Sequence, residues 1–310
     1  GRCGAGAPFF AGKRTMTIEH GTADVNGITL HYAHSGKDND HLLLFLHGFP
    51  EFWYEWRHQL EEFGRDYHAV APDGRGYNLS SKPVGVDNYQ SPNMVEDVRQ
   101  LALHFGAKKF TLVGHDWGGA VAWAFAIARH EMLDKLVMIN MAHIACFLRE
   151  MENSVEQQAA SQYVRLMKSD EAEAVLSANN FEELWKFATF DELQARGLMT
   201  DEDKAAYKEA WGQPGALTGM VNWYRAAFFD VKDPGQKPDP SPIAGMDLTV
   251  RVPTLLIWGD RDKYLTNGCL DGTEEFVPNV TIKKIPGVSH WVATEKPDLV
   301  NQYMREFLET

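Results

Sequence analysis

The sequence predicts an α/β fold in which a doubly wound, mostly parallel sheet is interrupted by a helical insertion. Short apolar runs recur along the chain with helical stretches between them, an alternation typical of parallel sheets covered by helices. The alternation stops between about residues 142 and 246, where the sequence becomes helical and polar and ends in a proline-rich run at 233–242. It then resumes and continues to a final helix.

The individual elements follow from the apolar runs. A first strand is predicted at 28–34 (ITLHYAH), where apolar and polar residues alternate. The later runs are continuously apolar, which fits strands buried on both faces of a parallel sheet. These runs lie at 42–46, 69–71, 110–113, 136–139 and 254–258. Helices are predicted at 94–105, 118–130 and about 296–308. The chain therefore divides into a first core part at 16–141, a helical cap at 142–246 and a second core part at 247–310.

Composition limits the partners of the protein. The chain has 310 residues, and its formal net charge is −13. Phosphate binding needs clustered Lys and Arg, so this charge argues against a nucleic-acid partner. No run approaches the roughly 20 apolar residues of a membrane span. We expect a small-molecule substrate, no membrane association, no cofactor and no metal, in a monomer or a homodimer.

The cysteines and the N-terminus bear on the compartment. Cys3, Cys146 and Cys269 show no metal or redox spacing, and a scattered odd set fits a reducing environment. Residues 1–15 precede Met16 and read as a processing or expression remnant. They lack the charged segment followed by an apolar one that marks a secretory signal. We expect a cytoplasmic protein.

A candidate nucleophile stands between a predicted strand and a predicted helix. Gly114-His115-Asp116-Trp117-Gly118 follows FTLV and precedes an Ala-rich segment. This is the strand–turn–helix pattern Gly-x-nucleophile-x-Gly, with Asp where many hydrolases carry Ser. The turn is crowded, and a Cβ two residues either side of the nucleophile would collide with neighbouring elements. Asp before a helix is also a common N-cap, so the partners of Asp116 decide between the two interpretations.

The first partner is a candidate oxyanion site. The apolar run 42–46 leads directly into His47-Gly48-Phe49-Pro50. A glycine after a core strand lets a backbone N–H, here that of Phe49, point into a pocket. The N–H of Trp117, directly after Asp116, can join it to hold a developing oxyanion. Gly and Pro also punctuate ordinary turns, which is the structural alternative.

A candidate acid and base follow later in the chain. The run 254–258 leads into Gly259-Asp260-Arg261-Asp262, at a strand end where open α/β sheets place their ligands. His290 stands in a loop before the last helix. The order is nucleophile Asp116, acid Asp262 and base His290, as in this kind of hydrolase. Asp260 is a rival acid. A carboxylate after the run 136–139 could also have served, but that run ends in Asn140-Met141-Ala142.

With these elements in place, the chain resembles the α/β-hydrolase-fold epoxide hydrolases. The motifs that carry the resemblance are HGFPEFWYEWRHQL (47–60), VAPDGRGYNLSSKP (70–83), GHDWGG (114–119), WGDRD (258–262) and IPGVSHWV (285–292). The resemblance spans about residues 17–310 and is weakest in the cap. Gly74 is a departure, since relatives more often carry a larger residue there.

The resemblance implies two cap tyrosines that bind and protonate the epoxide oxygen. Tyr163 and Tyr224 stand where the family places them, and Tyr207 competes with Tyr163. The alternative is that each is a packed helical tyrosine. An apolar pocket involving His47, Phe49, Trp117 and Trp291 is expected to bind a lipophilic epoxide, which water converts to a vicinal diol through an ester of the nucleophile.

Other activities on the same fold are considered beside this one. Haloacetate dehalogenases carry Arg directly after the nucleophile and three residues on, where this chain has Trp117 and Ala120. Haloalkane dehalogenases share the Trp but typically read HGNP where this chain reads HGFP. Haloalkane dehalogenation is thus the alternative activity. A small-molecule receptor or an esterase-like protein is the third possibility.

Overall fold

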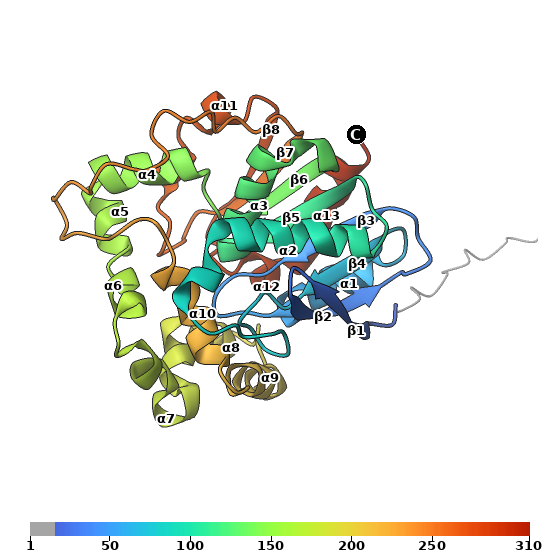
Figure 1. Ribbon diagram of the computed structural model, residues 1–310, viewed down its shortest axis with the longest axis horizontal. Coiled ribbons are helices and arrows are strands. Elements are labelled where there is room, and N and C mark those ends of the chain that lie inside the picture. Colours follow the sequence, from blue (N-terminus) through green and yellow to red (C-terminus); the bar gives the residue numbers. More distant parts are fainter. Residues whose placement is uncertain (1–15) are drawn as a thin grey trace, which may run out of the picture.

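The computed structural model describes residues 16–310, which form one eight-stranded sheet with helices on both faces and a helical insertion to its side (Figure 1). The strand order is β1-β2-β4-β3-β5-β6-β7-β8. β2 is antiparallel to β1 and to β4, and every other neighbouring pair is parallel. The strands are β1 (Glu19–Val25), β2 (Ile28–Ser35), β3 (Leu42–Leu46), β4 (His68–Pro72), β5 (Phe110–His115), β6 (Leu133–Ile139), β7 (Thr254–Gly259) and β8 (Val280–Ile285).

The central strands are apolar throughout because helices cover both faces of the sheet. Successive strand residues point to opposite faces. In β3, Leu42, Leu44 and Leu46 join the core under α2 (Ser91–His104) and α3 (Asp116–Ala128). Leu43 and Phe45 join the core under α1 (Arg57–Phe63) and α13 (Pro297–Leu308). Each such side chain stabilises the fold by about 1.5–3 kcal/mol.

β1 is a strand that the apolar runs do not reveal. It is an edge strand, and of its seven residues Ala23 and Val25 are the buried ones. The turn that joins it to β2 is Asn26-Gly27, with φ values of 48° and 75°. Two successive residues at positive φ make the turn that closes tight hairpins, and Asn-Gly is its strongest sequence signal. The signal for this hairpin was therefore present in the sequence.

Seven helices occupy the connection between β6 and β7. The chain forms no strand between the end of β6 and the start of β7, and the alternation of strands and helices in the sequence stops in the same region. Indole groups tie the insertion to the core: Trp211 Nε1 donates to the carbonyl of Pro50 at 2.5 Å, and Trp223 Nε1 donates to that of Arg75 at 2.9 Å. The helices are α4 (Ile144–Asn153), α5 (Val155–Ala160), α6 (Tyr163–Lys168), α7 (Ala172–Phe187), α8 (Phe190–Ala195), α9 (Asp201–Trp211) and α10 (Ala216–Arg225).

Two expectations from the sequence concern the membrane and the N-terminus. Within residues 16–310, none of the helices combines the length and apolar character needed to cross a membrane. The expectations for residues 1–15 and for Cys3 fall outside the described residues. Cys146 and Cys269 are both buried and free.

The turn between β5 and α3 is closely surrounded by backbone. Asp116 has φ +49°, a left-handed conformation that costs a non-glycine residue about 1–2 kcal/mol. A Cβ on Gly114 would lie 2.7 Å from the carbonyl oxygen of Gly118, and one on Gly118 would collide with the carbonyl oxygens of Leu46 and His47. Both glycines are required because backbone occupies the space on either side of Asp116.

Candidate active site

Asp116, His290 and Asp262 meet at the ends of three parallel strands. Asp116 follows β5, Asp262 follows β7, and His290 lies in the loop between β8 and α12 (Val292–Glu295). His290 Nε2 lies 3.4 Å from Asp116 Oδ2, and His290 Nδ1 lies 2.5 Å from Asp262 Oδ2. The structure thus brings the three predicted residues together in the order carboxylate, imidazole, carboxylate.

The carboxylate of Asp262 is fixed by donors on both of its oxygens. Its Oδ1 accepts from the backbone N–H groups of Tyr264 (2.7 Å) and Leu265 (3.0 Å). Its Oδ2 accepts from Asn140 Nδ2 at 2.9 Å as well as facing His290. Asp260, the rival acid, instead accepts from the backbone N–H of Gly287 at 2.7 Å, away from the imidazole. Geometry therefore favours Asp262.

Asn140 is a site residue that sequence reasoning passed over. It ends β6 at φ +37° and is fully buried. Its amide spans to β7, since Oδ1 accepts from the N–H of Gly259 at 2.8 Å and Nδ2 donates to Asp262. A buried amide with each end engaged fixes the spacing of the two strand ends. Its signal in the sequence was the polar residue closing the run 136–139.

The charges of the site support one another. Burial raises the pKa of Asp116, but the hydrogen bond and charge of His290 and the charge of His115 outweigh burial and leave the pKa lowered. Burial lowers the pKa of His290, but Asp262 and Asp116 outweigh it and leave the pKa raised. Asp116 is therefore an ionised carboxylate at neutral pH.

A backbone N–H group contacts the oxygen of Asp116 that does not face His290. The N–H of Phe49 donates to Asp116 Oδ1 at 2.8 Å. The N–H of Trp117 belongs to the first turn of α3, where amides have no partner within the helix. The two oxygens of Asp116 are thus distinct: Oδ1 is held by an amide and Oδ2 faces the imidazole.

A cavity of about 200 Å³ opens in front of Asp116. Its wall is mainly aromatic, and two of the four predicted substrate-binding residues, Phe49 and Trp291, belong to it. His47 does not: its Nε2 accepts from the N–H of Gly74, and it borders a different cavity of about 420 Å³. Trp117 lies outside the lining and packs edge-on against Tyr224. The lining consists of Phe49, Asp116, Tyr163, Phe187, Tyr224, Tyr264, His290 and Trp291.

The two predicted cap tyrosines reach this cavity from α6 and α10. Their ring centroids are 6.0 Å apart and nearly perpendicular. Burial, together with the negative charge of Asp116, raises the pKa of both phenols. Both are therefore protonated at neutral pH and able to donate a hydrogen bond.

Two other buried tyrosines, the competitor Tyr207 and Tyr264, have their hydroxyls engaged. Tyr207 lies outside the cavity, and its hydroxyl donates to Glu51 Oε1 at 3.0 Å. Tyr264 lines the cavity, but its hydroxyl donates to the backbone carbonyl of Phe187 at 2.7 Å. The structure thus separates Tyr163 from its competitor Tyr207.

Comparison with known proteins finds many relatives of this chain. The model of the alpha/beta hydrolase fold family matches residues 41–297. The AB hydrolase superfamily protein YfhM of Bacillus subtilis is 40% identical over 92% of this chain and 96% of that protein. Epoxide hydrolase 1 of Caenorhabditis elegans is 38% identical over 91% of this chain and 68% of that protein.

Solved structures give the same result. The chain is similar to a mutant epoxide hydrolase from Bacillus megaterium solved with its product, a naphthyloxy-propanediol. The TM-score is 0.85 and the identity 37%, over 94% of this chain and all of the other. The match includes the helical insertion as well as the sheet, since it covers nearly the whole chain.

Replacing Asn140 with Ala should destabilise the fold and loosen Asp262. A buried hydrogen-bonding group that loses its partner costs about 1–3 kcal/mol, and here Gly259 N–H and one lone pair of Asp262 lose theirs. Urea unfolding measures the change. Asn153→Ala is the matched control, because Asn153 is exposed and its side-chain hydrogen bond to the carbonyl of Arg149 lies at the surface. An equal free-energy change in both variants would contradict the role given to Asn140.

Proposed function

We propose, on the premise that this chain belongs to the alpha/beta hydrolase fold family and within it to the epoxide hydrolases, that it converts an epoxide to a vicinal diol through an ester of Asp116. One observation carries the proposal. Two protonated phenols, Tyr163 and Tyr224, share a cavity with an ionised carboxylate. An attacking anion facing hydrogen-bond donors suits a substrate whose leaving atom is an oxygen.

In the first step, Asp116 Oδ2 attacks an epoxide carbon and the carbon–oxygen bond opposite breaks. The oxygen develops negative charge as an alkoxide, a poor leaving group. Tyr163 and Tyr224 donate hydrogen bonds to it, and these strengthen as the charge grows. One of the two phenols gives its proton to the alkoxide, which becomes the hydroxyl of the ester intermediate, and the phenolate that is left regains a proton from solvent before the next turnover. The insertion at 142–246 acts as a cap in this step, because it supplies both phenols.

In the second step, His290 removes a proton from water, which attacks the ester carbonyl carbon. Esterification removes the negative charge of Asp116, one of the two groups that raise the pKa of His290. The imidazole therefore becomes a free base when it is needed. Asp116 Oδ1 is the oxygen that becomes the oxyanion, and the N–H of Phe49 already contacts it at 2.8 Å. The N–H of Trp117 completes the oxyanion site, and Asp262 stabilises the imidazolium. The tetrahedral intermediate then collapses: the bond between the carbonyl carbon and the diol oxygen breaks, that oxygen takes the proton from the imidazolium, and the carboxylic acid that is left loses its proton as the Asp116 carboxylate is restored.

The aromatic lining favours a lipophilic substrate. Six of the lining side chains are aromatic residues other than His290. The space in front of Asp116 is small, about 200 Å³ with its opening to solvent included, so we expect a small epoxide to be the better substrate.

Replacing His290 with Gln should stop the reaction at the ester. Attack by Asp116 needs no base, whereas loss of a general base slows the water step by about 10²–10⁴-fold. Mass spectrometry of the intact protein after rapid quenching should show Asp116 carrying the added mass of the epoxide. Asp116→Asn is the control and should show no adduct. Loss of activity in His290→Gln without an adduct would refute the two-step scheme.

Removing one phenolic hydroxyl should slow formation of the ester. In Tyr224→Phe and Tyr163→Phe, the loss of a donor to the developing alkoxide should cost about 10²–10³-fold in the single-turnover rate, by analogy with a lost oxyanion donor. Tyr264→Phe is the matched control. It changes the same cavity wall by the same atom, but its hydroxyl is committed to Phe187.

The same variants separate epoxide from halide chemistry. A halide leaves without a proton, so the double variant of Tyr163 and Tyr224 should still form an ester with any haloalkane that the cavity accepts. Wild-type rates of epoxide alkylation in both single variants would make the tyrosines packing residues and would remove the main support for epoxide hydrolysis over dehalogenation.

A further inference from the structure

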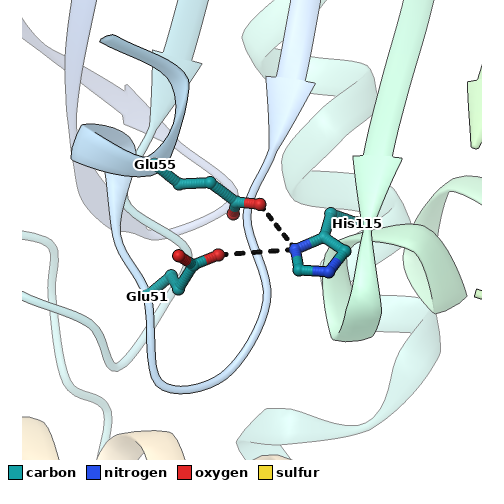
Figure 2. A group of neighbouring side chains, drawn as sticks. All are labelled: Glu51, Glu55 and His115. Carbon is teal, nitrogen blue, oxygen red and sulfur yellow. Dashed lines mark ion pairs between the residues drawn. The ribbon is translucent and has the colours of Figure 1, made fainter. Parts of the chain in front are cut away.

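Behind Asp116 lies a cluster of three buried ionisable side chains that the proposed mechanism does not use. Glu51 follows the His47–Pro50 loop, Glu55 lies on the 3₁₀ helix Trp53–Trp56, and His115 ends β5 (Figure 2). Each side chain is 1% exposed. One atom of each lies within 4.8 Å of the others. Because water does not reach these side chains, their charges must be balanced within the cluster.

The neighbours of His115 define where its protons lie. His115 Nε2 lies 2.9 Å from the carbonyl oxygen of His290. A carbonyl oxygen only accepts, so Nε2 carries a hydrogen. His115 Nδ1 lies 2.5 Å from Glu55 Oε1 and 3.4 Å from Glu51 Oε2. A bare lone pair on Nδ1 would be repelled by the oxygens of both carboxyls, so Nδ1 carries a hydrogen as well, and the positive ring balances the charge of one carboxylate.

The second carboxyl then leaves a charge to account for. If Glu51 and Glu55 were both ionised beside a positive His115, the cluster would carry a net negative charge. Within residues 16–310, no Lys or Arg forms an ion pair with either carboxyl. Burying an uncompensated charge costs several kcal/mol, and such groups take up a proton instead. Burial and the charge of Glu51 raise the pKa of Glu55 well above its usual value.

A metal ion suits this geometry less well than a proton does. Zinc holds nitrogen and oxygen ligands at about 2.0–2.2 Å in a tetrahedron, which keeps neighbouring ligand atoms roughly 3 Å or more apart. The separation of 2.5 Å between His115 Nδ1 and Glu55 Oε1 is shorter than that and is the distance of a direct ion pair.

We propose that Glu51, Glu55 and His115 form a proton-holding site, in which the two carboxyls retain one proton between them at neutral pH while His115 is positively charged. The cluster is then neutral overall, and its positive ring faces the active site. The proton belongs to the carboxyl pair rather than to either residue alone, because closely coupled groups titrate together.

The consequence for the reaction rests on the proposed function. The rings of His115 and His290 have centroids 4.6 Å apart. The positive charge of His115 lowers the pKa of both His290 and Asp116. His115 is thus a positioning residue that holds the carbonyl of His290 and opposes protonation of the base. Other titratable groups beside the cluster are Tyr207 of α9, which donates to Glu51, and His47, whose pKa the charge of Glu51 raises against the effect of burial. Asp116 and His290 themselves face His115.

Infrared spectroscopy of the substrate-free enzyme tests the proton directly. The wild type should show the carbonyl band of a buried carboxylic acid at neutral pH, sensitive to exchange into deuterated water. Glu55→Gln and Glu51→Gln should each lose this band, because a single remaining carboxyl ionises to pair with His115. Glu61→Gln, a change at an exposed position of α1, should keep it.

The infrared outcomes test the proton-holding site without any measurement of enzyme activity. Absence of the band in the wild type overturns the proposal, as does its persistence in both cluster variants. A band that appears only after treatment with a chelator also overturns it, because the cluster would then hold a cation. The wild-type spectrum decides the first and third outcomes even if a variant fails to fold.

A kinetic experiment tests the link to His290. In His115→Gln, the amide can still donate to the His290 carbonyl but the positive charge is gone. The pKa of His290 should rise, so the acidic limb of the rate of ester hydrolysis should move up by about one pH unit. An unmoved limb with the acid band present would overturn the link and keep the proton-holding site. No ester in any variant would instead overturn the proposed function.

Discussion

The left-handed backbone of Asp116 is the constraint on which the site depends. At φ +49°, the chain leaves β5 and enters α3 within one residue, which presents the carboxylate beyond the sheet edge. The conformation is unfavourable by itself, and the surrounding backbone holds it, since the carbonyls of Leu46 and His47 press against Gly118. The same packing brings the N–H of Phe49 onto Asp116 Oδ1. The packing of the backbone around Gly118 therefore fixes the position of the nucleophile and also supplies the hydrogen bond to its carboxylate.

Charge is distributed around Asp116 so that each step of the proposed reaction prepares the next. In the resting site, His290 and His115 keep Asp116 ionised against the effect of burial. When the carboxylate becomes an ester, the same loss of charge lowers the pKa of His290 and frees it as a base. Before the reaction the phenols opposite are protonated, because burial and the charge of Asp116 both raise their pKa. A dry aromatic wall makes each of these interactions stronger than it would be in water.

The central strands and the order of the three polar residues could be predicted from the sequence, because continuous apolar runs and glycine-flanked turns are local signals. The comparisons confirmed the fold and the family. β1 was missed because an edge strand is polar on its exposed face. Asn140 was read as the absence of a carboxylate, although its amide holds Asp262. Glu55 resembled an ordinary charged helix residue, since its partner His115 is distant in sequence and burial cannot be seen from neighbouring residues.

The central claim is that an oxygen of Asp116, and not an oxygen of solvent, forms the new bond to the substrate. A single turnover of excess enzyme in water labelled with heavy oxygen tests it most directly. The account predicts an unlabelled diol and a peptide containing Asp116 that has gained the label, because water attacks the carbonyl carbon of the ester. A labelled diol with an unlabelled Asp116 peptide would contradict it and would make Asp116 a base that activates water.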